Sequence, residues 1–104
     1  MMRRFSLLVL LVLVAGAAPA AECVVLLHGL ARTSTSMNKM QRELEGAGFL
    51  TANIDYPSRE YTVEKLADIA VADGLEACRA NDGIEKIHFV THSLGGILVR
   101  QYLS

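Results

Sequence analysis

The stretch HFVTHSLGGILVRQYL, residues 88–103, contains a strand pattern and a helix pattern joined at a serine. The apolar residues before Thr91 predict a buried strand, and those after Gly95 predict the opening of a helix. Ser93 lies in the turn between them, followed closely by Gly95 and Gly96. A sharp turn exposes a serine hydroxyl, and the glycines let the chain turn tightly and let the helix approach the strand. The pattern therefore predicts that Ser93 is displayed as a nucleophile.

The rest of the chain after residue 20 also alternates between strand and helix patterns. Two further apolar runs bring the expected strands to three, at residues 24–28, 49–54 and 86–91. Apolar residues at spacings of three and four predict helices at residues 36–47 and 62–79, and a third from Gly96 onward. Alternating strands and helices are typical of right-handed crossovers in a parallel sheet. The sequence predicts an α/β fold with three parallel strands and crossover helices.

The first predicted helix has a structural interpretation. Met37 and Met40 share its apolar face, and we expect both in the core. Ser34 or Thr35 is positioned to cap its amino terminus. Asp55, directly after the second strand, is expected to make a turn.

The first twenty residues form a segment of their own. Two arginines precede an apolar run at residues 5–14, and small residues follow up to Ala18-Pro19-Ala20. This order is that of a secretory signal peptide. A membrane anchor fits less well, because the apolar run is shorter than the roughly 20 residues that cross a bilayer. We therefore expect a signal peptide at residues 1–20 and export of a domain at residues 21–104 to the periplasm or the medium. Contact with a membrane is expected only through that transient signal or at a lipid interface.

Charge and cysteine content narrow the remaining classes of function. The chain has a net charge of −1 with 11 acidic side chains, and nothing in this balance favours a nucleic-acid partner. In an oxidising compartment Cys23 and Cys78 fit a disulfide, because both are expected at the same edge of the sheet, and they also fit two small buried residues. Neither cysteine has the spaced partners of a metal site. No phosphate-binding glycine motif follows a strand. We therefore expect no metal and no cofactor.

A second feature with chemical meaning is His28-Gly29-Leu30, directly after the first expected strand. A glycine at the carboxyl end of a parallel strand lets the next N–H group turn into the crevice where such sheets bind ligands. The helix start after Ser93 aims further N–H groups at developing negative charge. The N–H groups of Leu30 and Leu94 are therefore the expected halves of an oxyanion hole.

With both features present in this order, VVLLHGLARTSTSM and HFVTHSLGGILVRQYL resemble the amino-terminal half of a bacterial lipase or esterase of the α/β-hydrolase fold. The resemblance covers residues 23–103. It implies that Ser93 attacks an ester or lipid substrate as the nucleophile and forms an acyl-enzyme, with Leu30 and Leu94 as the oxyanion hole. The residues that it implies as support are His28, Gly29, His92, Gly95 and Gly96. Thr91 departs from the glycine of the standard G-x-S-x-G pattern.

The resemblance also implies an acid and a histidine after the nucleophile. The eleven residues after Ser93 contain no Asp, Glu or His. The histidines that are present have structural interpretations: His28 orders its loop, His88 is packed or lies at a sheet edge, and His92 points away from Ser93. We therefore expect an incomplete hydrolase domain, truncated after the nucleophile turn and inactive as this chain alone.

Other functions stay open at this point. The same turn serves other α/β-hydrolase activities, such as acyltransferases and peptidases, and a non-catalytic remnant or interaction module would also retain it. Three parallel strands leave apolar edges unpaired and bury a small share of the surface. We therefore expect residues 21–104 alone to be marginally stable and prone to aggregation.

Overall fold

Strand β2 (Ala21–Leu27) is the centre of a parallel sheet in the computed structural model, which describes residues 21–104. β3 (Leu50–Ile54) pairs with one of its sides and β4 (Ile84–Thr91) with the other. Leu27 is in register with both Ile54 and Thr91, so the strands end together at one edge of the sheet. The predicted α/β fold with three parallel strands is confirmed for the described residues.

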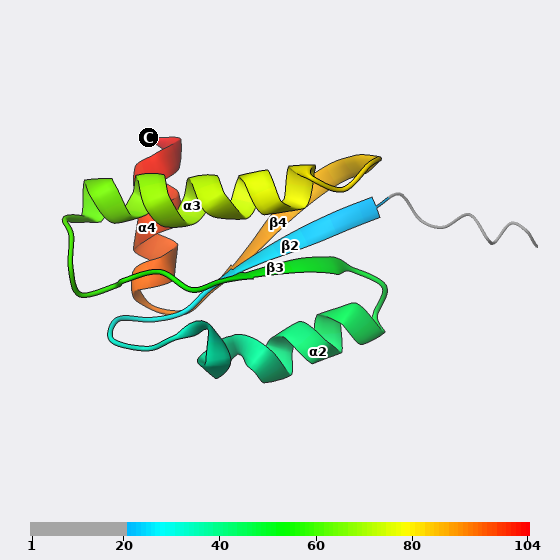
Figure 1. The fold of residues 1–104 in the computed structure, drawn as a ribbon, viewed down its shortest axis with the longest axis horizontal. Coiled ribbons are helices and arrows are strands. Elements are labelled where there is room, and N and C mark those ends of the chain that lie inside the picture. The colour runs from blue at the N-terminus through cyan, green and yellow to red at the C-terminus, as the bar shows by residue number, and fades with distance from the viewer. Residues whose placement is uncertain (1–20) are drawn as a thin grey trace, which may run out of the picture.

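Helices cover both faces of this sheet (Figure 1). The short 3₁₀ helix η1 (Ser34–Met37) and α2 (Asn38–Gly46) lie on one face, and α3 (Val63–Arg79) and α4 (Leu94–Leu103) on the other. Successive side chains of a strand point to opposite faces. The core beside α3 and α4 therefore takes Cys23, Val25 and Leu27 from β2, whereas the core beside α2 takes Val24 and Leu26. Burial on both faces explains why β2 is apolar without interruption from Cys23 to Leu27.

The long helix α3 has the ends that its sequence predicts. The Thr62 side chain accepts a hydrogen bond from the Lys65 N–H group at 3.2 Å, and the helix ends at Arg79. Its buried face contains Gly74, where a side chain would collide with Val25 of β2. The glycine thus lets α3 approach the central strand closely.

The structure corrects the expectations for the first helix. Met40 is 42% exposed rather than in the core, and the neighbouring Gln41 faces β3 and donates to the Thr51 hydroxyl at 2.9 Å. Neither Ser34 nor Thr35 caps the helix, which begins with the 3₁₀ turn of η1. The Ser34 N–H group instead donates to Asp55 Oδ1 at 3.0 Å, so the cap comes from the loop after β3.

A disulfide joins the start of β2 to the last turn of α3. Cys23 and Cys78 are both fully buried, with their Cα atoms 5.8 Å apart. Of the two alternatives that the sequence left open, the structure has the covalent one. Cys78 occupies the inward position near the end of α3, and the neighbouring Ala77 is exposed.

The predicted signal peptide, residues 1–20, lies outside the described residues. Within residues 21–104, no helix combines the length and the apolar content that crossing a membrane requires.

Candidate active site

The His28-Gly29-Leu30 loop and the Ser93 turn lie next to each other at the edge where the strands end. The His92 N–H group donates to the Leu27 carbonyl at 3.1 Å, which extends the pairing of β2 and β4 beyond their last residues. A Cβ atom placed on Gly29 would lie 2.6 Å from His92 Nδ1. The two motifs, far apart in the sequence, are therefore in direct contact, at the end of a parallel sheet where ligands bind.

Ser93 has the backbone of a sharp strand-to-helix turn. Its φ is 55° and its ψ is −116°, a conformation that residues with a Cβ atom rarely adopt. The residue is exposed, and α4 begins at Leu94, two residues before the predicted start at Gly96. Glycine has a low helix propensity, so the pair Gly95-Gly96 led to a predicted start that was two residues too late. The sharp turn at Ser93 is followed by the helix at once.

Two glycines make room for this turn, each against a different strand. A Cβ atom on Gly95 would lie 2.7 Å from the Leu27 carbonyl oxygen of β2. A Cβ atom on Gly96 would lie 3.2 Å from Thr91 Oγ1 of β4. The space left by Gly96 therefore accommodates the hydroxyl of Thr91, the residue that departs from the usual glycine of the pattern.

The backbone N–H groups of Leu30 and Leu94 have no hydrogen-bond acceptor among residues 21–104. Leu94 is the first residue of α4, so its N–H group precedes the hydrogen-bonding pattern of the helix. Leu30 follows Gly29 in a turn closed by a hydrogen bond from the Arg32 N–H group to the Gly29 carbonyl at 3.1 Å. One belongs to the His28-Gly29-Leu30 loop and the other directly follows Ser93, and each can donate a hydrogen bond to an acceptor such as an oxyanion.

His28 is fully buried and uses both ring nitrogens within the fold. Nδ1 lies 2.8 Å from the Gly29 carbonyl oxygen, which can only accept, so Nδ1 carries the proton. Nε2 accepts from the Tyr56 N–H group at 3.2 Å, and the Tyr56 ring stacks on the imidazole with centroids 4.1 Å apart. Both ring nitrogens are therefore engaged within the fold, and Asp55 Oδ1 lies 3.6 Å from Nε2. With its lone pair occupied, His28 is placed to order the loop and not to take a proton from Ser93.

Neither of the other two histidines makes a side-chain hydrogen bond to Ser93 within residues 21–104. His88 lies on the edge strand β4 and its Nε2 is 2.7 Å from Glu22 Oε1, with both side chains partly exposed. His92 lies against Gly29. Among residues 21–104, no histidine, aspartate or glutamate makes a hydrogen bond to the Ser93 hydroxyl, so the described residues place no base beside it.

Sequence reasoning missed two residues that shape this site, Tyr56 and Ser58. The Tyr56 hydroxyl donates to the His28 carbonyl at 2.6 Å, and Ser58 Oγ accepts from the Ala31 N–H group at 2.8 Å. Burial raises the pKa of Tyr56 to about 12, so its phenol remains a donor at any ordinary pH. One available signal was position, because these residues directly follow a strand that ends beside β2.

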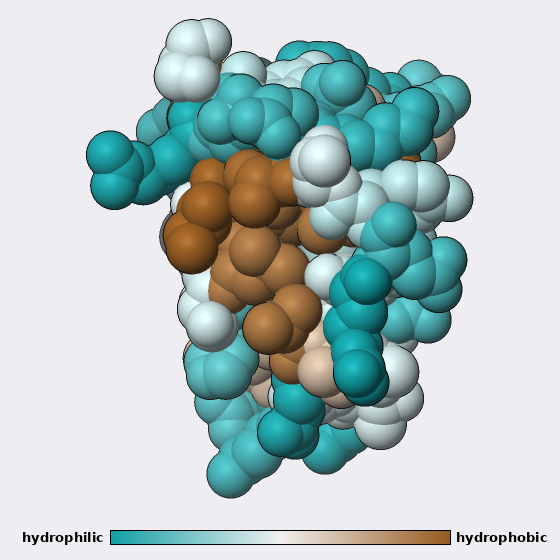
Figure 2. Space-filling model, turned by 90° about the vertical axis from the view of Figure 1, so that its left-hand side faces the viewer, coloured by the Kyte–Doolittle hydropathy of each residue, from teal (hydrophilic) through white to brown (hydrophobic). Residues whose placement is uncertain are grey.

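The edge that contains these loops carries an apolar patch on its surface (Figure 2). Leu30 of the first loop is 57% exposed and Ile97 of α4 is 55% exposed.

No group of three or more His, Cys, Asp or Glu side chains within residues 21–104 is arranged to hold a metal ion.

Comparisons with protein-family models, with curated proteins and with solved structures found no significant match to this chain.

Proposed function

We propose that this chain carries the nucleophile and the oxyanion hole of an exported serine hydrolase that acts on carboxylic esters, of the α/β-hydrolase type. The observation that carries the proposal is the backbone of Ser93, held at φ 55° and ψ −116° between β4 and α4. The N–H groups of Leu30 and Leu94, which have no acceptor among residues 21–104, support the same proposal. The disulfide supports export, because such bonds persist in oxidising compartments.

In the proposed reaction, Ser93 Oγ forms a bond to the ester carbonyl carbon while its proton passes to a base. The N–H groups of Leu30 and Leu94 stabilise the negative charge on the carbonyl oxygen. The intermediate then expels the alcohol, which takes the proton, and leaves an acyl group on Ser93. Water releases the acid in a second step of the same kind. No side chain of residues 21–104 supplies the base or its acid partner. We therefore propose that residues 21–104 alone hydrolyse esters poorly or not at all.

Two alternatives have their own support. An acyltransferase or a peptidase would use the same turn, and only the acceptor or the leaving group would differ. A non-catalytic interaction module is favoured by the lack of a base beside Ser93 and by the apolar patch at the site edge.

The proposal is tested by supplying the missing base from solution. The full chain is incubated with p-nitrophenyl butyrate and imidazole, and acylation of each serine is followed by mass spectrometry of peptides. We expect Ser93 to be acylated at least about 100-fold faster than Ser104, an exposed serine at the end of α4, because Ser104 has no oxyanion donors. Acylated lysines in the same digest measure the unspecific background.

Two variants sharpen this experiment. Leu30→Pro removes one N–H donor, and proline is tolerated at the second position of a turn; the acylation rate of Ser93 should fall by about 100-fold. Ser104→Ala is the matched control and should leave that rate unchanged. Equal acylation of Ser93 and Ser104, or an unaffected rate in Leu30→Pro, would overturn the proposed function in favour of the interaction module.

A further inference from the structure

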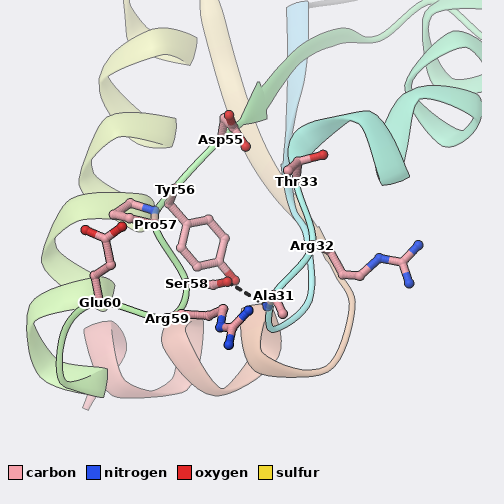
Figure 3. Close-up of a pocket in the computed structure, with 9 residues that line it drawn as sticks. All are labelled: Ala31, Arg32, Thr33, Asp55, Tyr56, Pro57, Ser58, Arg59 and Glu60. Atoms are coloured by element: carbon pink, nitrogen blue, oxygen red, sulfur yellow. Dashed lines mark hydrogen bonds between the residues drawn. The ribbon is translucent and has the colours of Figure 1, made fainter.

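The loop after β3 binds the His28–Ser34 segment through a series of hydrogen bonds (Figure 3). Tyr56 binds His28 twice, through its hydroxyl at the carbonyl and through its N–H group at Nε2. Ser58 accepts from the Ala31 N–H group. Asp55 accepts from the Ser34 N–H group. His28 and Ala31 belong to the loop that contains Leu30, and Ser34 begins η1 directly after that loop.

These contacts act on either side of Leu30. His28, two residues before it, is held by Tyr56 at 2.6 and 3.2 Å, and Ala31, directly after it, is held by Ser58 at 2.8 Å. Ala31 has a φ of 60°, in the left-handed region that alanine disfavours. Without the bond to Ser58, the turn would be free to relax to a conformation in which the Leu30 N–H group points elsewhere.

Tyr56 and Ser58 are buried although both carry a hydroxyl. Tyr56 is 4% exposed and Ser58 is 7% exposed, and the hydroxyl of each makes a hydrogen bond to the backbone of the loop that contains Leu30. A buried hydroxyl in an apolar core would lower stability if it were unpaired. An apolar residue would fill either position without that requirement, so the hydroxyls are needed for the geometry of the loop. In Figure 3 Tyr56 and Ser58 face the turn at Ala31, whereas Arg32 points away from it.

We propose that Tyr56 and Ser58 are positioning residues for the oxyanion hole, which hold the Leu30 N–H group where the developing negative charge of the ester carbonyl will lie. The inference rests on the proposed function for its chemical meaning. It assigns to the loop after β3 the task of orienting a donor that belongs to the loop after β2. Neither side chain touches the substrate.

The test combines amide exchange with the acylation assay on the full chain. In Ser58→Ala, hydrogen–deuterium exchange measured by NMR should become at least tenfold faster at Ala31, while the amides of α3 keep their rates. The Ser93 acylation rate at saturating ester should fall about tenfold, and the half-saturating ester concentration should stay unchanged, because only transition-state binding is weakened. Tyr56→Phe should reproduce the kinetic effect.

Two control variants separate positioning from general stability. Ser58→Thr retains the hydroxyl and should restore much of the acylation rate, and Tyr61→Phe, at a residue that is 52% exposed, should change nothing. Exchange that accelerates equally in α3, or an acylation rate unaffected by Ser58→Ala and Tyr56→Phe, would overturn the inference. Absence of Ser93 acylation in the unmodified chain would overturn the proposed function instead, and the exchange rates would still decide whether Ser58 holds the loop.

Discussion

Ser93 is held in a conformation that costs free energy. Its φ of 55° and ψ of −116° lie outside the regions that L-residues favour, and such a residue costs about 1–3 kcal/mol. Hydrogen bonds of its neighbours maintain it, from the His92 N–H group to Leu27 and from the Gly95 N–H group to the His92 carbonyl. Under the proposed function, this strain lowers stability at a position where the exposed hydroxyl is needed.

Replacing Ser93 by glycine should therefore stabilise the chain. Glycine adopts positive φ without steric cost but is more flexible when unfolded, so we expect Ser93→Gly to raise the free energy of unfolding by about 1 kcal/mol. Urea denaturation followed by circular dichroism measures this. Ser93→Ala removes the hydroxyl and retains the strain, so it should unfold at nearly the unmodified urea concentration. Equal midpoints for Ser93→Gly and Ser93→Ala would show that the turn stores no strain.

The turn from β4 to α4 requires the first turn of α4 to pack closely against the neighbouring strand β2. Gly95 lies so close to Leu27 that a side chain there would meet the backbone of β2. A backbone carbonyl in the middle of a sheet cannot move aside as the end of a flexible side chain can. The position of α4, and with it the position of the Leu94 N–H group, therefore depends on residue 95 being glycine.

Gly95→Ala should destabilise the chain, although alanine is the better helix former. We expect a loss of about 1–3 kcal/mol, as for other overpacked positions, measured by thermal or urea unfolding. Gly46, the last residue of α2, is the matched control because nothing lies within 4 Å of a Cβ atom there. Gly46→Ala should be neutral or stabilising by up to about 1 kcal/mol. A destabilisation of the same size at both glycines would contradict the contact between α4 and β2.

Across the whole molecule, the central strand is connected to the layer of helices by a covalent bond. The disulfide closes a loop between Cys23 and Cys78, 55 positions apart in the sequence, and ties β2 to α3. β3 and β4 each pair on one side only within residues 21–104, so the sheet has two open edges. A small domain of this kind buries a limited share of its surface. The disulfide lowers the conformational entropy of the unfolded chain, and we expect this effect to supply a large part of the stability.

Reduction of the disulfide should therefore weaken the fold markedly. A closed loop of this length predicts a loss of about 4 kcal/mol, a large fraction of the 5–15 kcal/mol typical of domains. Urea unfolding with and without dithiothreitol measures it. A Cys23→Ala/Cys78→Ala variant should resemble the reduced chain and should not respond to dithiothreitol. An unchanged midpoint on reduction would show that packing alone holds β2 against α3.

Much of the fold could be predicted because its signals are local. Thr62 and Arg79 bound α3 as expected, and the apolar run of β2 indicated burial on both faces. Where the prediction was wrong, a distant residue had intervened. Gln41 rather than Met40 bonds to the sheet, at Thr51, and η1 is capped by Asp55 from another loop.

The amino-acid sequence alone was enough to establish the alternating strands and helices, the parallel sheet and the sharp turn at Ser93. These depend on periodicity, glycines and helix propensity within a few residues. Only the tertiary structure brought Gly29 against His92, paired Cys23 with Cys78 and placed Tyr56 and Ser58 on the loop of Leu30. The physical reason is that these contacts join residues 27 to 63 positions apart, whose meeting depends on strand order and register rather than on local pattern.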